Sequence, residues 1–296
     1  MMRRAAPLLI LLALAGCGES TSPEYVAEVD AWHADRVARL TTDTGWLTLV
    51  GLHPLEGEFL VLGSAPEADV RLIDKAPARI GVLTQTDAAV TLTADPAAHL
   101  SVDDTILDTP LVLVPDVPGP PTIVAAGDLL FHLIERGGKR FLRVKDTKHP
   151  ALKEFAGIER YPVDARWRVT ARLEPHDPPR GVLVPNVLGQ LEEQPSPGVL
   201  VFELDGKECR LTPVGAPGEG LFLVFADATS GHTTYGGGRF LSTAPPGPDG
   251  TVVLDFNRSV SPPCAFSAYA TCPLPPEGNT LAVAVEAGEK SEAAAH

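Results

Sequence analysis

The chain has 296 residues, enough for one large or two medium domains, and its hydrophobic fraction of 44% is ordinary for a folded protein. Its formal net charge of −14 argues against a nucleic-acid partner and against electrostatic docking on anionic lipid. The 27 glycines and 29 prolines follow no short period, which indicates many turns between short strands rather than a collagen-like or disordered chain.

The N-terminus has the pattern of a bacterial lipoprotein signal. Arginines at positions 3 and 4 precede an apolar run over residues 7–13, and the sequence Leu-Ala-Gly-Cys then ends at Cys17. The apolar run is too short to remain as a membrane-spanning helix. We therefore expect residues 1–16 to be cleaved and Cys17 to carry lipid, palmitate included. The alternatives are an ordinary secretory signal with an accidental cysteine, or a membrane anchor.

Lipidation at Cys17 predicts an extracytoplasmic protein of the cell envelope. Two or three acyl chains hold a protein stably on a membrane, so the membrane is the expected partner. Gly18 rather than aspartate follows the cysteine. By resemblance to enterobacterial lipoproteins, this glycine implies the periplasmic side of the outer membrane rather than the inner membrane.

The first element expected after the signal is an amphipathic helix over residues 23–40. Ser22 suits the N-cap, proline follows at the first helical position, and apolar residues recur at helical spacing as far as Leu40. After Gly45 apolar and polar residues alternate, which predicts short strands. These strands are expected over residues 46–50, 58–62, 70–73, 79–84, 88–93, 111–114 and 122–125.

This spacing of roughly ten residues per strand favours a β-sandwich. Residues 63–72 resemble the opening of forkhead-associated domains, which are β-sandwiches that bind phosphothreonine. That family places an arginine directly after the glycine, whereas Ser64 follows Gly63 here, and residues 78–81 lack its later Ser-x-x-His. The resemblance supports the sandwich shape and not phosphopeptide binding.

The second half of the chain continues in strands. A proline-rich run over residues 114–121 predicts either an interdomain connector or an extended crossing strand. A hairpin is expected around the turn at 136–139, and further strands over residues 167–171, 182–187, 199–204, 221–225 and 251–256. We therefore expect an all-β protein with one N-terminal helix: a helix and sandwich-like unit over 17–118, a larger β unit over 119–290, and a disordered tail over 291–296.

Residues 227–289 carry most of the polar motifs. They include Asp-Phe-Asn-Arg at 255–258, Pro-Pro-Cys-Ala-Phe at 262–266, Thr-Cys-Pro-Leu-Pro-Pro at 271–276 and Ala-Gly-Glu at 287–289. On these motifs the chain resembles the bacterial and archaeal domain-of-unknown-function family 1684, from about residue 32 to residue 289. Arg-Ser-Val-Ser-Pro at 258–262 departs from the Arg-Ala-Tyr-Asn-Pro of its relatives. The resemblance implies no established activity.

Five residues of this region are candidates for a ligand site. Asp255 and Asn257 follow an apolar strand and are two residues apart, so they share a face. Arg258 and Arg239 supply guanidinium groups that suit a carboxylate or phosphate, and Tyr235 is placed to close the same pocket. Alternatively, these residues form buried Asp–Arg pairs that lock a loop-rich corner.

The remaining cysteines and one ion pair complete the candidates. Cys209 sits in an alternating segment and is expected to be buried in a strand. Cys264 and Cys272 are expected to form a disulfide, a packed pair of reduced thiols, or a metal or nucleophilic site; their seven-residue separation is not that of a structural zinc site. Arg143 and Asp146 are expected to form a salt bridge at a turn.

Three functions follow from these residues. The first is an extracytoplasmic binding module for a small anionic molecule, such as a sugar acid, peptide end or envelope fragment, held by the five candidate residues. The second is a hydrolase with Asp255 as general base and the arginines stabilising developing negative charge. The third is a structural or interaction protein of the envelope. No motif indicates a metal or another cofactor.

Overall fold

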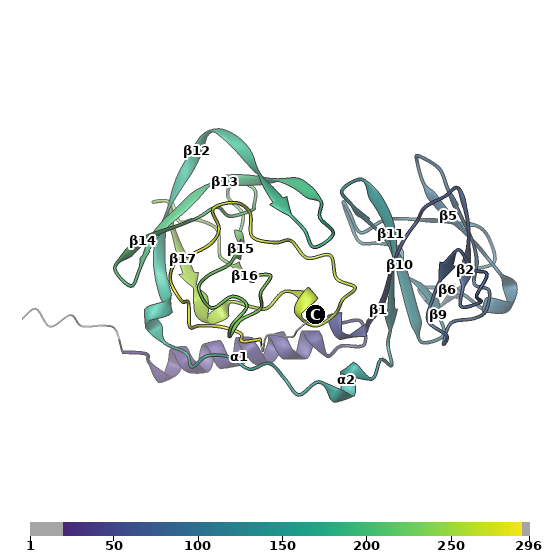
Figure 1. The fold of residues 1–296 in the computed structure, drawn as a ribbon, viewed down its shortest axis with the longest axis horizontal. Helices are drawn as coiled ribbons and strands as arrows, with labels where there is room; N and C mark the ends of the chain where they lie inside the picture. Colours follow the sequence, from purple (N-terminus) through teal and green to yellow (C-terminus); the bar gives the residue numbers. More distant parts are fainter. Residues whose placement is uncertain (1–19, 292–296) are drawn as a thin grey trace, which may run out of the picture.

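The computed structural model describes residues 20–291, which form two β units side by side (Figure 1). We call them the N-terminal unit, residues 49–146, and the C-terminal unit, residues 165–291. The expected mainly β fold with one long N-terminal helix is confirmed. No helix of the described part is long and apolar enough to cross a membrane. The expected signal peptide and Cys17, and all but Ser291 of the expected tail, lie outside the described residues.

Helix α1, Pro23–Leu40, forms where the sequence predicts it. The Ser22 hydroxyl accepts a hydrogen bond from the Tyr25 backbone N–H at 3.2 Å, so the serine caps the helix as expected. Val29 and Leu40 are fully buried on its inner face. Although α1 precedes the N-terminal unit in the chain, it runs along the C-terminal unit (Figure 1). This helix therefore packs on the unit that comes later in the chain and not on the one that follows it directly.

The N-terminal unit is a sandwich of two sheets. The first sheet has the order β1-β11-β10-β9-β6-β7 and the second has the order β3-β2-β4-β5-β8. The strands are β1 Leu49–Pro54, β2 Phe59–Gly63, β3 Val70–Arg71, β4 Gly81–Gln85, β5 Val90–Ala94, β6 Ser101–Val102, β7 Thr105–Ile106, β8 Leu111–Leu113, β9 Val124–Ala126, β10 Leu129–Arg136 and β11 Lys139–Asp146. The first expected strand starts later than predicted, because Trp46–Thr48 form a 3-10 turn before β1.

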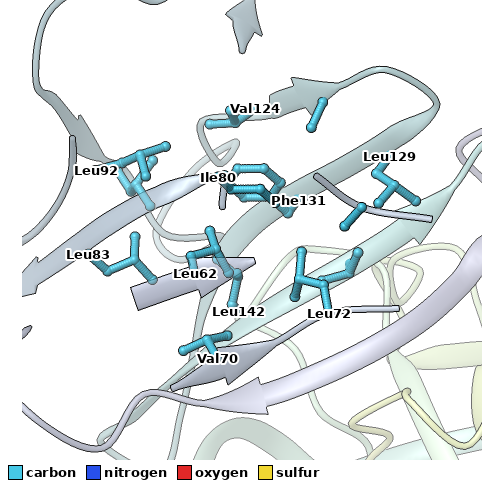
Figure 2. Packing of buried hydrophobic residues seen from close by; sticks show 14 of the residues in the cluster. Leu62, Val70, Leu72, Ile80, Leu83, Leu92, Val124, Leu129, Phe131 and Leu142 are labelled. Atoms are coloured by element: carbon cyan, nitrogen blue, oxygen red, sulfur yellow. The ribbon is translucent and has the colours of Figure 1, made fainter. Parts of the chain in front are cut away.

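One hydrophobic core joins the two sheets. The core includes Ile80 and Leu92 on the side of the second sheet, and Phe131 and Leu142 of the first sheet. All four side chains are fully buried and belong to one cluster. Figure 2 shows these side chains gathered between the strands. Burial of large aliphatic and aromatic side chains stabilises each by about 1.5–3 kcal/mol. This core makes the N-terminal unit a structural body of its own.

The expected division after residue 118 falls inside this unit. Strands β9, β10 and β11 complete the first sheet, and β11 pairs antiparallel with β1 from Leu49 to Pro54. The proline-rich run at 114–121 therefore connects the two sheets of the sandwich and is not an interdomain linker. The structural boundary lies after Asp146, where a short helix α2, Ala151–Glu154, leads to the C-terminal unit.

The C-terminal unit contains a four-stranded sheet of order β14-β13-β12-β17 and a two-stranded sheet of β15 and β16. The strands are β12 Arg168–Pro185, β13 Leu191–Leu204, β14 Lys207–Leu211, β15 Phe222–Phe225, β16 Arg239–Ser242 and β17 Thr251–Asp255. Residues after β17 form two 3-10 turns, η4 Phe256–Arg258 and η5 Pro263–Ala265, followed by irregular chain. Trp167, Phe225 and Phe256 are among the residues of its separate core.

The two units meet at the outer face of the first sheet. Leu142 and Val144 of β11 point into the N-terminal core, so Arg143 between them points outwards. His132 of β10 pairs opposite Arg143 and shares its face. Nevertheless Arg143 is only 4% exposed and His132 only 6%. Hydrogen bonds join β11 and the turn before it to the C-terminal unit, which covers this face.

Candidate functional site

A pocket of about 350 Å³ lies where the two units meet. We call it the interunit pocket. It is lined among others by Trp46 and Arg136 from the first part of the chain, and by Asn186, Phe240, Thr271 and Cys272 from the C-terminal unit. Most of its wall is apolar, with a few polar groups. Pockets of this composition are the usual places for small ligands.

Arg143 lies directly behind the wall of the interunit pocket. Its Nη2 donates to the Thr271 hydroxyl at 2.9 Å, and its guanidinium lies over the Trp46 ring, 5.5 Å from the centroid. Its Nε has no hydrogen-bond partner, and no carboxylate of residues 20–291 is within ion-pair distance. Burial, and then the charge of Arg136, lowers the pKa of Arg143 to about 10. The side chain therefore stays cationic at neutral pH with little compensation.

Two neighbours of Arg143 have different environments. Arg136 forms a two-point ion pair with Asp116, with oxygen distances of 2.9 and 2.5 Å. His132 Nδ1 has no hydrogen-bond partner, and burial, followed by the charge of Arg143, lowers the pKa of His132 to about 4. His132 is consequently neutral near pH 7. Arg143 shares this face with Lys145, whose ammonium donates to the Thr44 carbonyl, and neither cation has a carboxylate partner among the described residues.

The expected Arg143–Asp146 salt bridge is wrong. Residues three apart in a strand lie on opposite faces, so the two side chains diverge along β11. Asp146 instead accepts a hydrogen bond from the Lys75 ammonium at 2.7 Å and one from the Lys148 backbone N–H at 2.9 Å. These interactions outweigh burial and lower the pKa of the Asp146 carboxyl.

Cys264 and Cys272 lie together beside the interunit pocket. All three described cysteines are free thiols, so this pair has the reduced, packed arrangement and Cys209 is buried in β14 as expected. The Cys264 backbone N–H donates to Cys272 Sγ at 3.1 Å. Cys264, like Trp46 and Phe240, packs against a small cluster that contains Cys272. Cys272 lines the interunit pocket, and Cys264 lies next to it.

Asp255, Asn257 and Arg258 lie together, but α1 lies over them. We call this region the α1 corner. The Tyr25 hydroxyl of α1 donates to Asp255 Oδ1 at 2.7 Å and accepts from Asn257 Nδ2 at 3.0 Å. Burial, and then the hydrogen bond to Asp255, raises the pKa of Tyr25.

Two further ion pairs fasten α1 to the same region. Arg258 pairs with Glu28 of α1 and with Asp255 at 3.2 Å. Arg36 of α1 pairs with Glu289 at 3.2 Å, and the other oxygen of Glu289 accepts from the Ser261 backbone N–H at 2.7 Å. The Asp-Phe-Asn-Arg and Ala-Gly-Glu motifs therefore hold a helix of their own chain, and a general-base role for Asp255 would first require displacing Tyr25.

The two other candidate residues lie elsewhere. Arg239 is fully buried, and its Nη2 donates to Asp227 Oδ2 at 2.7 Å and to the Val285 carbonyl at 2.9 Å. The Tyr235 hydroxyl donates to the Cys264 carbonyl at 3.3 Å. The structure thus separates the five candidates into the α1 corner, the Arg239–Asp227 pair and the cysteine region. None of the five lines the interunit pocket.

Sequence reasoning did not assign a ligand role to Trp46, Arg143, Asn186 or Thr271. A signal existed only for Arg143, a charged residue flanked by apolar ones in a strongly apolar hairpin. The pocket's other residues are far apart in the sequence and meet only when the units pack. Among the described residues no three His, Cys, Asp or Glu side chains gather in a way that would hold a metal ion.

Residues 153–290 match DUF1684, a family described as a protein of unknown function. This segment of the chain belongs to the DUF1684 family. The DUF1684 segment covers nearly all of the C-terminal unit and leaves out α1 and the N-terminal unit. A solution NMR structure of an uncharacterized protein of Haloarcula marismortui is 33% identical, covers 49% of this chain and 80% of that chain, and has a TM-score of 0.41. No curated protein matches the chain.

Proposed function

We propose that this protein is a lipid-anchored, extracytoplasmic binding protein that takes a small anionic ligand in the interunit pocket. The observation that carries the proposal is the burial of Arg143 without a carboxylate partner. By contrast, Arg36 of α1 and Arg239 and Arg258 of the C-terminal unit each pair with a carboxylate. An uncompensated buried charge costs free energy, which an anion in the pocket would offset.

The composition of the pocket supports a ligand with an apolar body and one negative group. Trp46 and Phe240 provide aromatic wall, and Asn186 provides an amide able to donate and to accept. Thr271, which accepts from Arg143, exposes its side chain in the same wall. An anionic group beside Thr271 would therefore come close to the guanidinium without leaving the pocket. Carboxylates and phosphate monoesters have the required charge.

The α1 corner supports an architectural role for the residues that the sequence suggested as ligand groups. Asp255, Asn257 and Arg258 make their hydrogen bonds and ion pairs with α1. We therefore propose that the anionic ligand binds in the interunit pocket and not at the α1 corner.

A thermal-shift screen tests the ligand site. Aromatic and aliphatic carboxylates and phosphate monoesters are compared with uncharged analogues of the same body. A ligand at a hundred times its dissociation constant should stabilise the protein by about 2.7 kcal/mol. We expect Arg143→Met to abolish this shift and the matched control Arg258→Met to retain it. The reverse pattern would place the ligand at the α1 corner, and absence of any shift across the panel would reject the binding function.

The anchor is tested separately by metabolic labelling with a palmitate analogue. The wild-type chain should incorporate the label and fractionate with membranes, because a thioether-linked lipid requires the Cys17 thiol. Cys17→Ser should lose both properties, and Cys209→Ser should keep them. Labelling that persists in Cys17→Ser would contradict lipidation at this residue.

A further inference from the structure

We propose that Cys264 and Cys272 form a redox-active thiol pair that reduces small disulfides beside the interunit pocket, Cys264 being the attacking and Cys272 the resolving residue. Cys272 lines that pocket and Cys264 lies next to it. The proposal does not depend on the anionic ligand or on Arg143, and its basis is the proximity of the two cysteines, their unequal exposure and the way their loop is held.

The two cysteines are next to each other in space. The Cys264 backbone N–H donates to Cys272 Sγ at 3.1 Å, which brings the Cys272 sulfur against the backbone of Cys264. A disulfide requires two cysteines at short range. The pair has that proximity while both residues are free thiols.

The two cysteines differ as an attacking and a resolving thiol should. Cys264 is partly exposed, whereas Cys272 is 4% exposed. The neighbouring Cys272 thiol outweighs burial and lowers the pKa of Cys264 to about 7. The Cys264 thiol and burial raise the pKa of Cys272. A thiol with a pKa near the ambient pH is the most effective attacking group in disulfide exchange.

The loop that carries Cys272 holds its position without a disulfide. The Val187 backbone N–H donates to the Cys272 carbonyl at 3.0 Å, and the Leu274 N–H donates to the Pro185 carbonyl at 2.7 Å. These bonds tie residues 272–274 to the end of β12, next to pocket residue Asn186. Since a bridge is not needed to fix the loop, the sulfurs are free to cycle between two states.

The reaction is a two-step exchange with a low-molecular-weight disulfide as oxidant. The Cys264 thiolate attacks one sulfur of the disulfide, forms a mixed disulfide and releases the other half as a thiolate. Cys272 then loses its proton and attacks Cys264 Sγ, which forms the Cys264–Cys272 bond and releases the second half. One disulfide becomes two thiols, and one dithiol becomes one disulfide. A thiol reductant reverses the exchange.

The test uses the full chain, purified from membranes in mild detergent and reduced under anaerobic conditions. It is mixed with dithiobis-nitrobenzoate, which is a small aromatic disulfide, and separately with the uncharged hydroxyethyl disulfide. We expect two equivalents of coloured thiolate per native chain from the first probe. Peptide mapping should then show a Cys264–Cys272 bridge with both probes and no lasting mixed disulfide. The initial reaction should be at least tenfold faster at Cys264 than at Cys209.

Three variants separate the roles. Cys272→Ser should release one equivalent and retain a mixed disulfide on Cys264, and Cys264→Ser should lose the fast phase. Cys209→Ser is the matched control and should behave as wild type. Should a serine variant fail to give a cooperative thermal transition, the bridge mapped in the wild type decides the question.

Two results would overturn the proposal. The first is a pair whose chemistry requires unfolding. Either the reduced thiols react only in the unfolded chain, or a Cys264–Cys272 disulfide present in the purified protein cannot be reduced before the chain unfolds. The second is a stable mixed disulfide on wild-type Cys264, because Cys272 would then not be a resolving residue. Neither result bears on anion binding, which the thermal-shift screen measures with the thiols reduced.

Discussion

Arg239 in the C-terminal core and Arg143 at the interunit pocket are both almost completely buried, yet their surroundings are opposite. Arg239 donates to the carboxylate of Asp227 and to two backbone carbonyls, and its guanidinium lies over the Phe225 ring. Arg143 has a hydroxyl and an indole face and no carboxylate among the described residues. The Nε atoms of both arginines lack a hydrogen-bond partner, so the two differ in the carboxylate that only Arg239 has.

This difference shows why residue type alone does not identify a ligand site. Arginine beside aspartate is equally suited to bind an anion and to lock a core. What separates the two cases is whether the chain itself provides the counter-charge. In this molecule α1 provides it for Arg258 and Glu289 of the family motifs, whereas Glu192, the carboxylate in the wall of the interunit pocket, forms no ion pair with Arg143.

The largest effect that would test this comparison comes from replacing Arg239. Arg239→Met removes the partner of the fully buried Asp227 carboxylate and two hydrogen bonds to carbonyls. Breaking a buried pair in this way costs about 3–5 kcal/mol of unfolding free energy. Urea denaturation of the C-terminal transition measures the loss.

The matched control is the same substitution at the other buried arginine. Arg143→Met exchanges an uncompensated charge for an apolar side chain of similar length, so the unfolding free energy should change by less than about 1 kcal/mol. Equal losses in the two variants would show that Arg143 is a structural residue and would remove the contrast between the two regions.

A smaller effect is expected from pH. The pKa of His132 is about 4 in the folded protein and near 6.5 when the chain is unfolded. Between these values the unfolded state binds a proton that the folded state does not, so acidification favours unfolding. The contribution of neutral His132 to the free energy of unfolding should be fully present above about pH 6.5. It should decline toward pH 4, by at most about 3 kcal/mol.

The variant His132→Gln isolates this contribution. Burial raises the pKa of Glu289, so that residue stabilises the fold as the pH falls and opposes His132 in the total curve. Subtracting the denaturation curve of His132→Gln from that of the wild type at each pH removes Glu289 from the comparison. A difference that does not vary between pH 4 and pH 6.5 would contradict a neutral, buried His132.

Much of the fold follows from local sequence. The capped helix at Pro23–Leu40, the hairpin of β10 and β11 and the burial of Cys209 all follow from periodicity and capping. The unit boundary does not, because the proline-rich run near residue 118 has the composition of a linker. Only the pairing of β11 with β1, across roughly ninety residues, places β9 to β11 in the first unit.

The site follows from sequence to a lesser degree. Asp255, Asn257 and Arg258 were expected to cluster and do, but their partners are on α1. Tyr25, which bonds Asp255 and Asn257, is 230 residues away from Asp255, and Arg258 pairs with Glu28. No periodicity or spacing connects such positions. The interunit pocket likewise combines Trp46 with Thr271 and Cys272, which meet only when two complete units pack together. Side-chain pairing over these separations is a property of tertiary structure.

The position of α1 has a consequence for the order in which the molecule assembles. Its contacts at Asp255, Arg258 and Glu289 are supplied by residues 230 to 253 positions later in the chain. Contacts at such separations close slowly, because the loop entropy is lost before the contacts form. The N-terminal unit can complete its sandwich while α1 still has no partner. Docking of α1 is therefore a late step, and truncation before Asp255 should leave it undone.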